Sequence, residues 1–239
     1  MPKAEELHDV LRDLRACLEN DLENGIRETG VSRELLASIG SAASRPPADP
    51  LGEIAARVAV CTACDLHRTR TQTVPGQGAP DPEIVFIGEA PGADEDRQGI
   101  AFVGRAGQLL TRMIEAMGYT REEVFIGNIL KCRPPNNRTP LPEEMSTCLP
   151  YLKEQIALLR PRVIVALGAT AAKALLDTTE GISKLRGCWR SFEGIDLMPT
   201  YHPAYLLRNP SAKRQVWDDL QAVLARLGRE PPARNRPSV

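Results

Sequence analysis

The chain has 239 residues, of which 42% are hydrophobic and 26% are charged, a composition typical of globular proteins. No apolar run approaches the roughly 18 residues of a membrane-spanning helix, and residues 1–20 are too charged for a secretory signal, so the expected location is the cytoplasm, without membrane contact. The net charge of −1, from 30 Lys and Arg against 31 Asp and Glu, argues at first against a nucleic-acid-binding protein.

The first 50 residues are expected to form a helical extension and a linker. Apolar residues recur at helical spacing from Leu7 to Leu18, and a weaker pattern of the same kind runs from Val31 to Ile39. Residues 41–50 are small, polar and proline-rich, which is typical of a flexible linker. We therefore predict a helical N-terminal extension over residues 1–40.

From Leu51 onward, short β-rich runs alternate with helical patterns. This alternation predicts a mainly parallel, four-stranded sheet covered on both faces by helices, in a domain over residues 51–228 with a flexible tail at 229–239. Pro150 predicts a kink or break in the helical pattern that contains it. The predicted strands are residues 83–87, 124–130, 162–167 and 195–198. The predicted helices are residues 107–117, 142–159, 169–176 and 211–227.

Polar or glycine-rich segments follow three of the predicted strands. They comprise residues 88–92, 128–137 and 201–203. In parallel sheets ligands bind beyond the carboxyl ends of the strands, so we expect these segments to converge on an active site.

The cysteines predict a metal site, with buried structural thiols as the alternative. Cys61 and Cys64 form a CxxC pair, and Cys132 and Cys148 lie at the two ends of a proline-rich stretch. Four thiolates fit either tetrahedral zinc or a [4Fe–4S] cluster, and spacing does not decide between them. His67 is a weaker candidate ligand. The remaining cysteines are expected to be structural, namely Cys17 and Cys188.

The three loops contain side chains suited to catalysis. The glycine-rich turn at residues 88–92 could bind a carbonyl or an anion through its N–H groups, and Glu89 could activate water or stabilise positive charge. The amide of Asn128 could pair with a base edge. His202 follows a strand among polar and aromatic residues. The alternatives are a plain turn, a strand-end cap and a structural histidine.

The charge is unevenly distributed along the chain. Residues 1–60 contain 7 basic and 11 acidic side chains, whereas residues 61–239 contain 23 basic and 20 acidic ones. Basic side chains gather in three stretches, residues 131–138, 184–190 and 208–214. The total charge therefore does not exclude contact with DNA phosphates.

Taken together, these segments resemble the family 4, iron–sulfur uracil-DNA glycosylases of the uracil-DNA glycosylase superfamily. The resemblance covers roughly residues 51–227. It is carried, in chain order, by CTACDLHRTRTQTVPGQG (61–78), GEAPGADED (88–96), GIAFVGRAGQLL (99–110), GNILKCRPPNNRTP (127–140), Cys148, VIVALGATAA (163–172) and YHPAYLLRNP (201–210).

The resemblance implies a three-layer α/β/α fold and a structural [4Fe–4S] cluster on Cys61, Cys64, Cys132 and Cys148. It also implies an enzyme that flips uracil out of single- or double-stranded DNA, hydrolyses its N-glycosidic bond and leaves an abasic site. A nucleoid-associated monomer is expected, with the N-terminal helices available to replication or repair proteins.

The resemblance further implies how uracil is recognised. Phe102 would stack on the uracil ring, and the amide of Asn128 would pair with its polar edge and reject cytosine. Backbone amides around Gly88 and Ala90 would hold a carbonyl.

Catalytic and DNA-binding roles follow from the same resemblance. Glu89 would face the sugar, Glu95 would be a second acidic contributor, and His202 would donate a hydrogen bond to the departing uracil anion. Leu206 and Leu207 would enter or flank the minor groove. The candidate DNA contacts are Asn137, Arg138, Lys184, Arg186, Leu207 and Arg208.

Two alternatives stand beside the hydrolytic enzyme. A sister group traps uracil-DNA covalently through a histidine in a basic loop, whereas residues 131–140 here contain no histidine. A zinc-stapled domain of unrelated function would use the same cysteines. The hydrolytic enzyme is therefore the favoured interpretation.

Overall fold

The computed structural model describes residues 49–232, so the predicted helices of residues 1–40 lie outside the described residues. The described part begins with helix α3 (Pro50–Ala59), which starts at the last residue of the predicted linker. Asp49 accepts a hydrogen bond from the N–H of Gly52 at 2.9 Å, and proline suits the first helical turn because it needs no N–H partner there.

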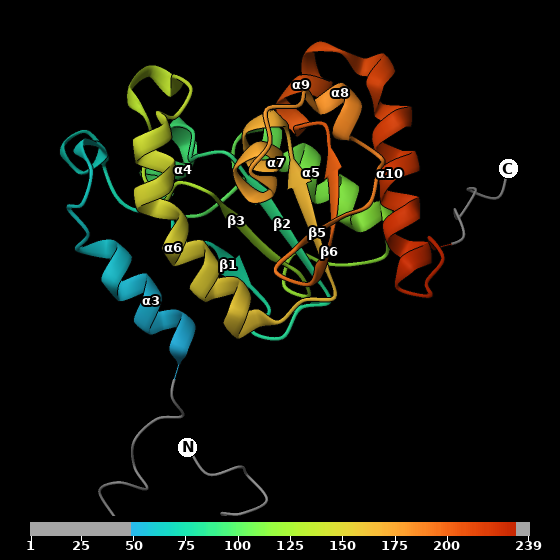
Figure 1. Ribbon diagram of the computed structural model, residues 1–239, viewed down its shortest axis with the longest axis horizontal. Helices are drawn as coiled ribbons and strands as arrows, with labels where there is room; N and C mark the ends of the chain where they lie inside the picture. Colours follow the sequence, from blue (N-terminus) through green and yellow to red (C-terminus); the bar gives the residue numbers. More distant parts are fainter. Residues whose placement is uncertain (1–48, 233–239) are drawn as a thin grey trace, which may run out of the picture. The chain divides into compact units, whose positions relative to one another are not determined.

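A mixed sheet forms the centre of the described residues (Figure 1), with six strands in the order β1-β3-β2-β4-β6-β5. The four central strands are parallel and coincide with the predicted ones. They are β2 (Ile84–Gly88), β3 (Phe125–Asn128), β4 (Val163–Leu167) and β6 (Ile195–Thr200). The predicted count of four was too low, because β1 (Gln77–Gly78) and β5 (Arg190–Phe192) add short antiparallel edges that give no periodic signal.

Helices cover both faces of the sheet, which confirms the three-layer α/β/α prediction (Figure 1). On one face, α5 (Arg105–Ala116) and α10 (Lys213–Arg226) share a core with Ile84 and Phe86. On the other face, α6 (Pro142–Leu159) and α7 (Ala169–Leu176) share a core with the intervening Val85 and Ile87. β2 is therefore buried on both sides, as its continuous apolar run predicts.

The predicted break at Pro150 is wrong, because α6 runs through it as one helix. Pro150 and Ser146 both lie on the exposed side, where water can satisfy the carbonyl that loses its helical partner. No helix within residues 49–232 is long and apolar enough to cross a bilayer.

Short elements that the sequence did not predict occupy the connections. They are η1 (Asp65–Arg68), α4 (Ala93–Gln98), η2 (Pro135–Asn137), α8 (Ile182–Leu185), α9 (Pro203–Arg208) and η3 (Pro210–Ala212). Beyond α10, Arg229 forms an ion pair with Glu83, so ordered contacts extend into the first residue of the predicted tail.

A buried ion pair joins α10 to the segment after α8. Arg186 donates to the carboxylate of Asp219, which is 2% exposed and also accepts from Thr200 Oγ1 at 2.6 Å. Burial raises the pKa of Asp219, against the opposing effect of these two donors. The guanidinium that we predicted as a phosphate contact is thus engaged inside the protein.

Asp219→Ala should lower the free energy of unfolding by about 3–5 kcal/mol, because it leaves the Arg186 charge without its partner. Asp218→Ala is the matched control, since Asp218 is the exposed neighbour on the same helix, and its effect should stay within about 0.5 kcal/mol. Urea denaturation measures both. Equal stability of the two variants would contradict a structural role for this pair.

Candidate functional site

The carboxyl ends of β2 and β3 bring two of the predicted site segments together. Gly88 lies opposite Asn128 in the parallel register. The pairing continues past both strands, since Ile129 N–H donates to Gly88 O at 2.9 Å and Leu130 N–H donates to Glu89 O at 3.0 Å. The segment after β6 joins them in one pocket. Its lining includes Glu89, Ala90, Glu95, Phe102, Asn128, Asn137, Arg138, His202 and Arg208.

Gly88 forms a point of close approach in this pocket. A Cβ at Gly88 would lie 2.5 Å from Asn128 Oδ1 and 2.5 Å from Phe102 Cζ. The missing side chain therefore lets an aromatic ring and a side-chain amide meet at the end of β2.

The amide of Asn128 has an unusual environment. The residue is 1% exposed, and its Oδ1 is the one buried side-chain N or O atom within residues 49–232 that has no hydrogen-bond partner. An unsatisfied buried acceptor costs about 1–3 kcal/mol, so this atom is suited to a ligand that supplies a donor.

His202 presents a defined tautomer to the pocket. Its Nδ1 accepts a hydrogen bond from Ala204 N–H at 3.1 Å, so the neutral ring carries its proton on Nε2. Burial, assisted by the charge of Arg208, lowers the pKa of His202 to about 4. The ring lies 5.6 Å from that of Phe102, centroid to centroid. At neutral pH the pocket therefore contains an uncharged N–H donor beside an aromatic face.

The acidic residues near the pocket have different surroundings. Glu95 accepts from the N–H groups of Gly92 at 3.1 Å, and of Val103 and Gly104 at 2.9 Å each. No hydrogen bond or ion pair within the described residues engages the half-buried carboxylate of Glu89. Glu89 is therefore free to act on a ligand, whereas Glu95 holds two loops together.

The other two acids of the same loop are also engaged. Asp94 forms an ion pair with Arg97. Asp96 is 3% exposed and accepts from Thr71 Oγ1 at 2.7 Å. These contacts leave Glu89 as the available carboxylate of the loop.

The predicted DNA contacts lie partly at the pocket and partly elsewhere. Arg138 lines the pocket and forms an ion pair with Glu144 at 2.6 Å. Leu207 is exposed, at 38%, next to Arg208 on α9, whereas Leu206 is buried in the core, so the expectation that it enters the minor groove is wrong. Lys184 is exposed on α8.

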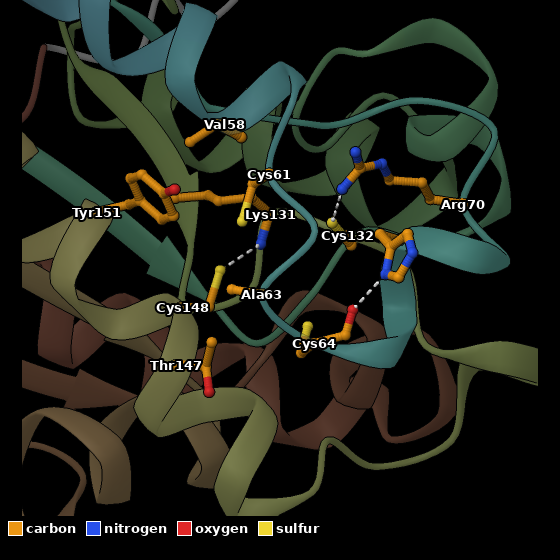
Figure 2. Close-up of a pocket in the computed structure, with 11 residues that line it drawn as sticks. Val58, Cys61, Ala63, Cys64, Arg70, Lys131, Cys132, Thr147, Cys148 and Tyr151 are labelled. Atoms are coloured by element: carbon orange, nitrogen blue, oxygen red, sulfur yellow. Dashed lines mark hydrogen bonds between the residues drawn. The ribbon is translucent and has the colours of Figure 1, made fainter.

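The four predicted cysteine ligands line a single hollow (Figure 2). Cys61 and Cys64 follow α3, Cys132 follows β3, and Cys148 lies in α6. His67 also lines this hollow, whereas Cys188 is exposed elsewhere. The structure thus brings together the four thiols that the resemblance implies.

Hydrogen-bond donors approach two of these sulfurs (Figure 2). Arg70 Nη1 donates to Cys132 Sγ at 3.1 Å, and the N–H of Lys131 donates to Cys148 Sγ at 3.3 Å. Burial raises the pKa of the Cys148 thiol to about 11 and also raises that of Cys132. Ligand binding at the hollow therefore has to displace protons from buried thiols.

Lys131 belongs to the basic stretch 131–138 that we expected to face DNA, but its side chain is instead buried inside the protein. It is 1% exposed, and its Nζ donates to Asn128 O at 3.0 Å and Gln155 Oε1 at 2.7 Å. Burial lowers its pKa to about 8, and no carboxylate within residues 49–232 forms an ion pair with it. Its position directly before Cys132 was the available signal, because a cation beside thiolates offsets their charge.

Comparison with known proteins identifies the family. Residues 75–221 match the family model described as the uracil DNA glycosylase superfamily. The chain belongs to the uracil-DNA glycosylase superfamily. It is 48% identical to the type-4 uracil-DNA glycosylase of Thermotoga maritima, over 74% of this chain and 94% of that protein.

Two further relatives agree with this assignment. The type-4 uracil-DNA glycosylase of Archaeoglobus fulgidus is 42% identical over 77% of this chain and 96% of its own length. The type-5 enzyme of Pyrobaculum aerophilum is 31% identical, over 64% of this chain and 74% of that protein. The expected relationship to type-4 uracil-DNA glycosylases is thereby confirmed.

His202 should remain neutral, with its proton on Nε2, from pH 8 down to about pH 5, because its pKa is lowered to about 4. ¹⁵N chemical shifts of labelled histidine measure this, and the spectrum of His202→Gln assigns the signal. In the unfolded chain His202 binds a second ring proton near pH 6.5. The free energy of unfolding should therefore decrease as the pH falls from about 6.5 to 4, because only the unfolded chain is protonated in this range. A midpoint near 6.5 in the folded enzyme would contradict the burial argument.

Proposed function

We propose that the enzyme flips uracil out of DNA and hydrolyses its N-glycosidic bond, releasing uracil and leaving an abasic site for base excision repair. Membership of the superfamily supports the reaction. The observation that carries the site assignment is the unpaired Oδ1 of buried Asn128, which approaches Gly88 closely together with the ring of Phe102.

Asn128 discriminates uracil from cytosine by the direction of its hydrogen bonds. Uracil offers an N3–H donor to Oδ1 and an O4 acceptor to the amide N–H, whereas cytosine offers an N3 acceptor and a 4-amino donor. Binding cytosine would leave buried polar groups unpaired, which sites of this kind reject strongly. Phe102 stacks on the ring face, and backbone amides near Gly88 and Ala90 hold a carbonyl.

Bond cleavage separates charge between the sugar and the base. The electron pair of the N-glycosidic bond moves to uracil N1 and spreads onto O2, while the sugar C1′ becomes positively charged. His202 Nε2–H donates a hydrogen bond to O2 and stabilises the anion, while the imidazole stays neutral and keeps its proton. Glu89 faces C1′, stabilises its positive charge, orients the water that attacks it and accepts the proton that this water loses. Glu95 acts through the loops that it holds.

We infer that the cysteine hollow holds a structural [4Fe–4S] cluster. The thiols of Cys61, Cys64, Cys132 and Cys148 line this one hollow, and four cysteine thiolates are the ligand set of such a cluster. Arg70 and buried Lys131 supply positive charge that offsets the thiolates. The cluster would join α6 to the segments after α3 and β3. It would thereby hold the basic stretch of residues 131–138 beside the pocket.

The remaining roles are proposals of the same kind. The substrate is single- or double-stranded uracil-containing DNA. It would be contacted by Asn137, Arg138, Lys184, Leu207 and Arg208. Arg186 would hold the neighbouring segment in place through its ion pair with Asp219. We propose a nucleoid-associated monomer in which residues 51–228 form the catalytic domain. The N-terminal helices proposed for residues 1–40, which the linker proposed for residues 41–50 connects to this domain, would contact replication or repair proteins.

A uracil-excision assay tests the reaction. Oligonucleotides with U:G, U:A, single-stranded U and a matched C are incubated with the enzyme and then treated with alkali. Alkali-dependent cleavage at uracil, with multiple turnovers and none at cytosine, is expected. A stable protein–DNA adduct without turnover would favour the covalent binder and contradict the proposal.

Asn128→Ala and His202→Ala should each lower the single-turnover excision rate by about 10²–10³-fold, since each removes a hydrogen bond to the reacting base. Iron content should stay at the wild-type level, because neither residue lines the cysteine hollow. Asp218→Ala serves as the active control. Near-wild-type turnover in either pocket variant would overturn this assignment of the pocket.

Cys132→Ala should lose iron, brown colour and thermal stability together, because metal binding is coupled to folding. Cys188→Ser is the matched control and should keep all three, since its exposed thiol does not line the hollow. Iron analysis, visible absorption and a melting curve are measured. A fully loaded Cys132→Ala protein would remove Cys132 from the ligand set, and a colourless wild type with stoichiometric zinc would refute the cluster.

A further inference from the structure

The backbone that carries Phe102 has a strained conformation. Phe102 has a φ of +54°, a left-handed value that costs a non-glycine residue about 1–2 kcal/mol. Such residues persist where the surroundings over-determine the backbone, and they cluster at ligand-binding positions. The contacts around residues 101–104 therefore show what holds the ring in place.

Two side chains fix the backbone before and at Phe102. Gln77 pairs with both polar groups of Ala101, accepting from its N–H at 3.0 Å and donating to its O at 3.1 Å. Arg121 donates to Ala101 O at 2.7 Å and to Phe102 O at 3.1 Å. Its Nη1 also donates to Thr111 Oγ1 at 3.0 Å. The guanidinium thus spans both carbonyls on either side of the strained φ.

Gly107 and Glu95 also hold the backbone around Phe102. A Cβ at Gly107 would overlap the carbonyl of Phe102, so the start of α5 packs directly on this peptide. Glu95 holds the next two N–H groups, those of Val103 and Gly104. Every peptide from Ala101 to Gly104 is therefore anchored by a side chain.

Holding these carbonyls with Arg121 carries a desolvation cost. Its side chain is half-buried, and within the part of the chain that the structure describes it forms no ion pair with a carboxylate. Burial lowers its pKa, against the opposing charges of Glu122 and Glu95. A half-buried guanidinium whose hydrogen bonds all go to neutral oxygens is hard to justify by stability alone.

We propose that Arg121 is a positioning residue for uracil recognition, which holds the carbonyls of Ala101 and Phe102 and so fixes the Phe102 ring beside Asn128 and His202. This inference rests on the proposed function, because it assigns the stacking face to Phe102. Arg121 touches no substrate atom and acts only through the peptide that it holds.

Arg121→Met should lower kcat/KM for uracil excision by about ten- to hundredfold, the range of a lost base-stacking contact. Its inhibition constant for free uracil should rise by a similar factor. Affinity for abasic product DNA should stay at the wild-type level, because that DNA has no base to stack. A general loss of structure would weaken both interactions, so this difference separates positioning from folding.

A double-mutant cycle with Phe102→Ala tests the route of the effect. If Arg121 acts through Phe102, then Arg121→Met should cause little further loss in the Phe102→Ala background. Full additivity of the two changes would overturn the proposal. Arg162→Met is the matched control, because Arg162 forms an ion pair with Glu83 at the opposite end of β2, and its kcat/KM should equal that of the wild type.

Arg121→Lys keeps the test valid if Arg121→Met does not fold. A lysine can reach one of the two carbonyls, so an intermediate loss of uracil affinity is expected, and wild-type affinity would overturn the proposal. The wild-type enzyme is assayed first. Absence of excision there would refute the proposed function, whereas an active wild type with an unaffected Arg121→Met variant would refute only this inference.

Discussion

The parallel pairing of β2 with β3 is the constraint on which the site depends. It sets Gly88 opposite Asn128 and continues through Ile129 and Leu130 after the strands have ended. Because this segment leads directly into Lys131 and Cys132, the same peptides that shape the pocket also reach the cysteine hollow. Lys131 closes the connection by donating to the carbonyl of Asn128. The backbone of residues 128–132 therefore belongs to both places, whereas the side chain of Asn128 lines only the pocket.

Some polar groups of the pocket hold its backbone in place through hydrogen bonds, and others have no protein partner. Glu95 is saturated by three N–H donors, whereas Glu89 and the Oδ1 of Asn128 have no protein partner among the described residues. His202 uses one nitrogen to cap α9 and keeps the other as a neutral donor. In the proposed mechanism, such preorganised and partly desolvated groups would stabilise developing charge without reorganising during the reaction.

Much of this architecture could be predicted from the sequence, for physical reasons. Strands buried on both faces give continuous apolar runs, so β2 and β4 were evident, and motif spacing identified the cysteines. Contacts between residues far apart in the sequence could not be predicted, because they leave no local sequence pattern. Nothing near Arg186 in the sequence points to Asp219, and nothing near Arg121 points to the peptide of Phe102. The edge strands β1 and β5 are too short for periodicity. Pro150 did not break α6, because the carbonyl that loses its helical partner belongs to Ser146, which lies on the exposed side.

A crystal structure of the enzyme with free uracil tests the central claim most directly. The account predicts the ring stacked on Phe102, with N3–H donating to Asn128 Oδ1, the amide N–H of Asn128 donating to O4, and His202 Nε2 within hydrogen-bond distance of O2. Uracil bound outside this pocket, or bound in it with Asn128 Oδ1 still unpaired, would contradict the assignment.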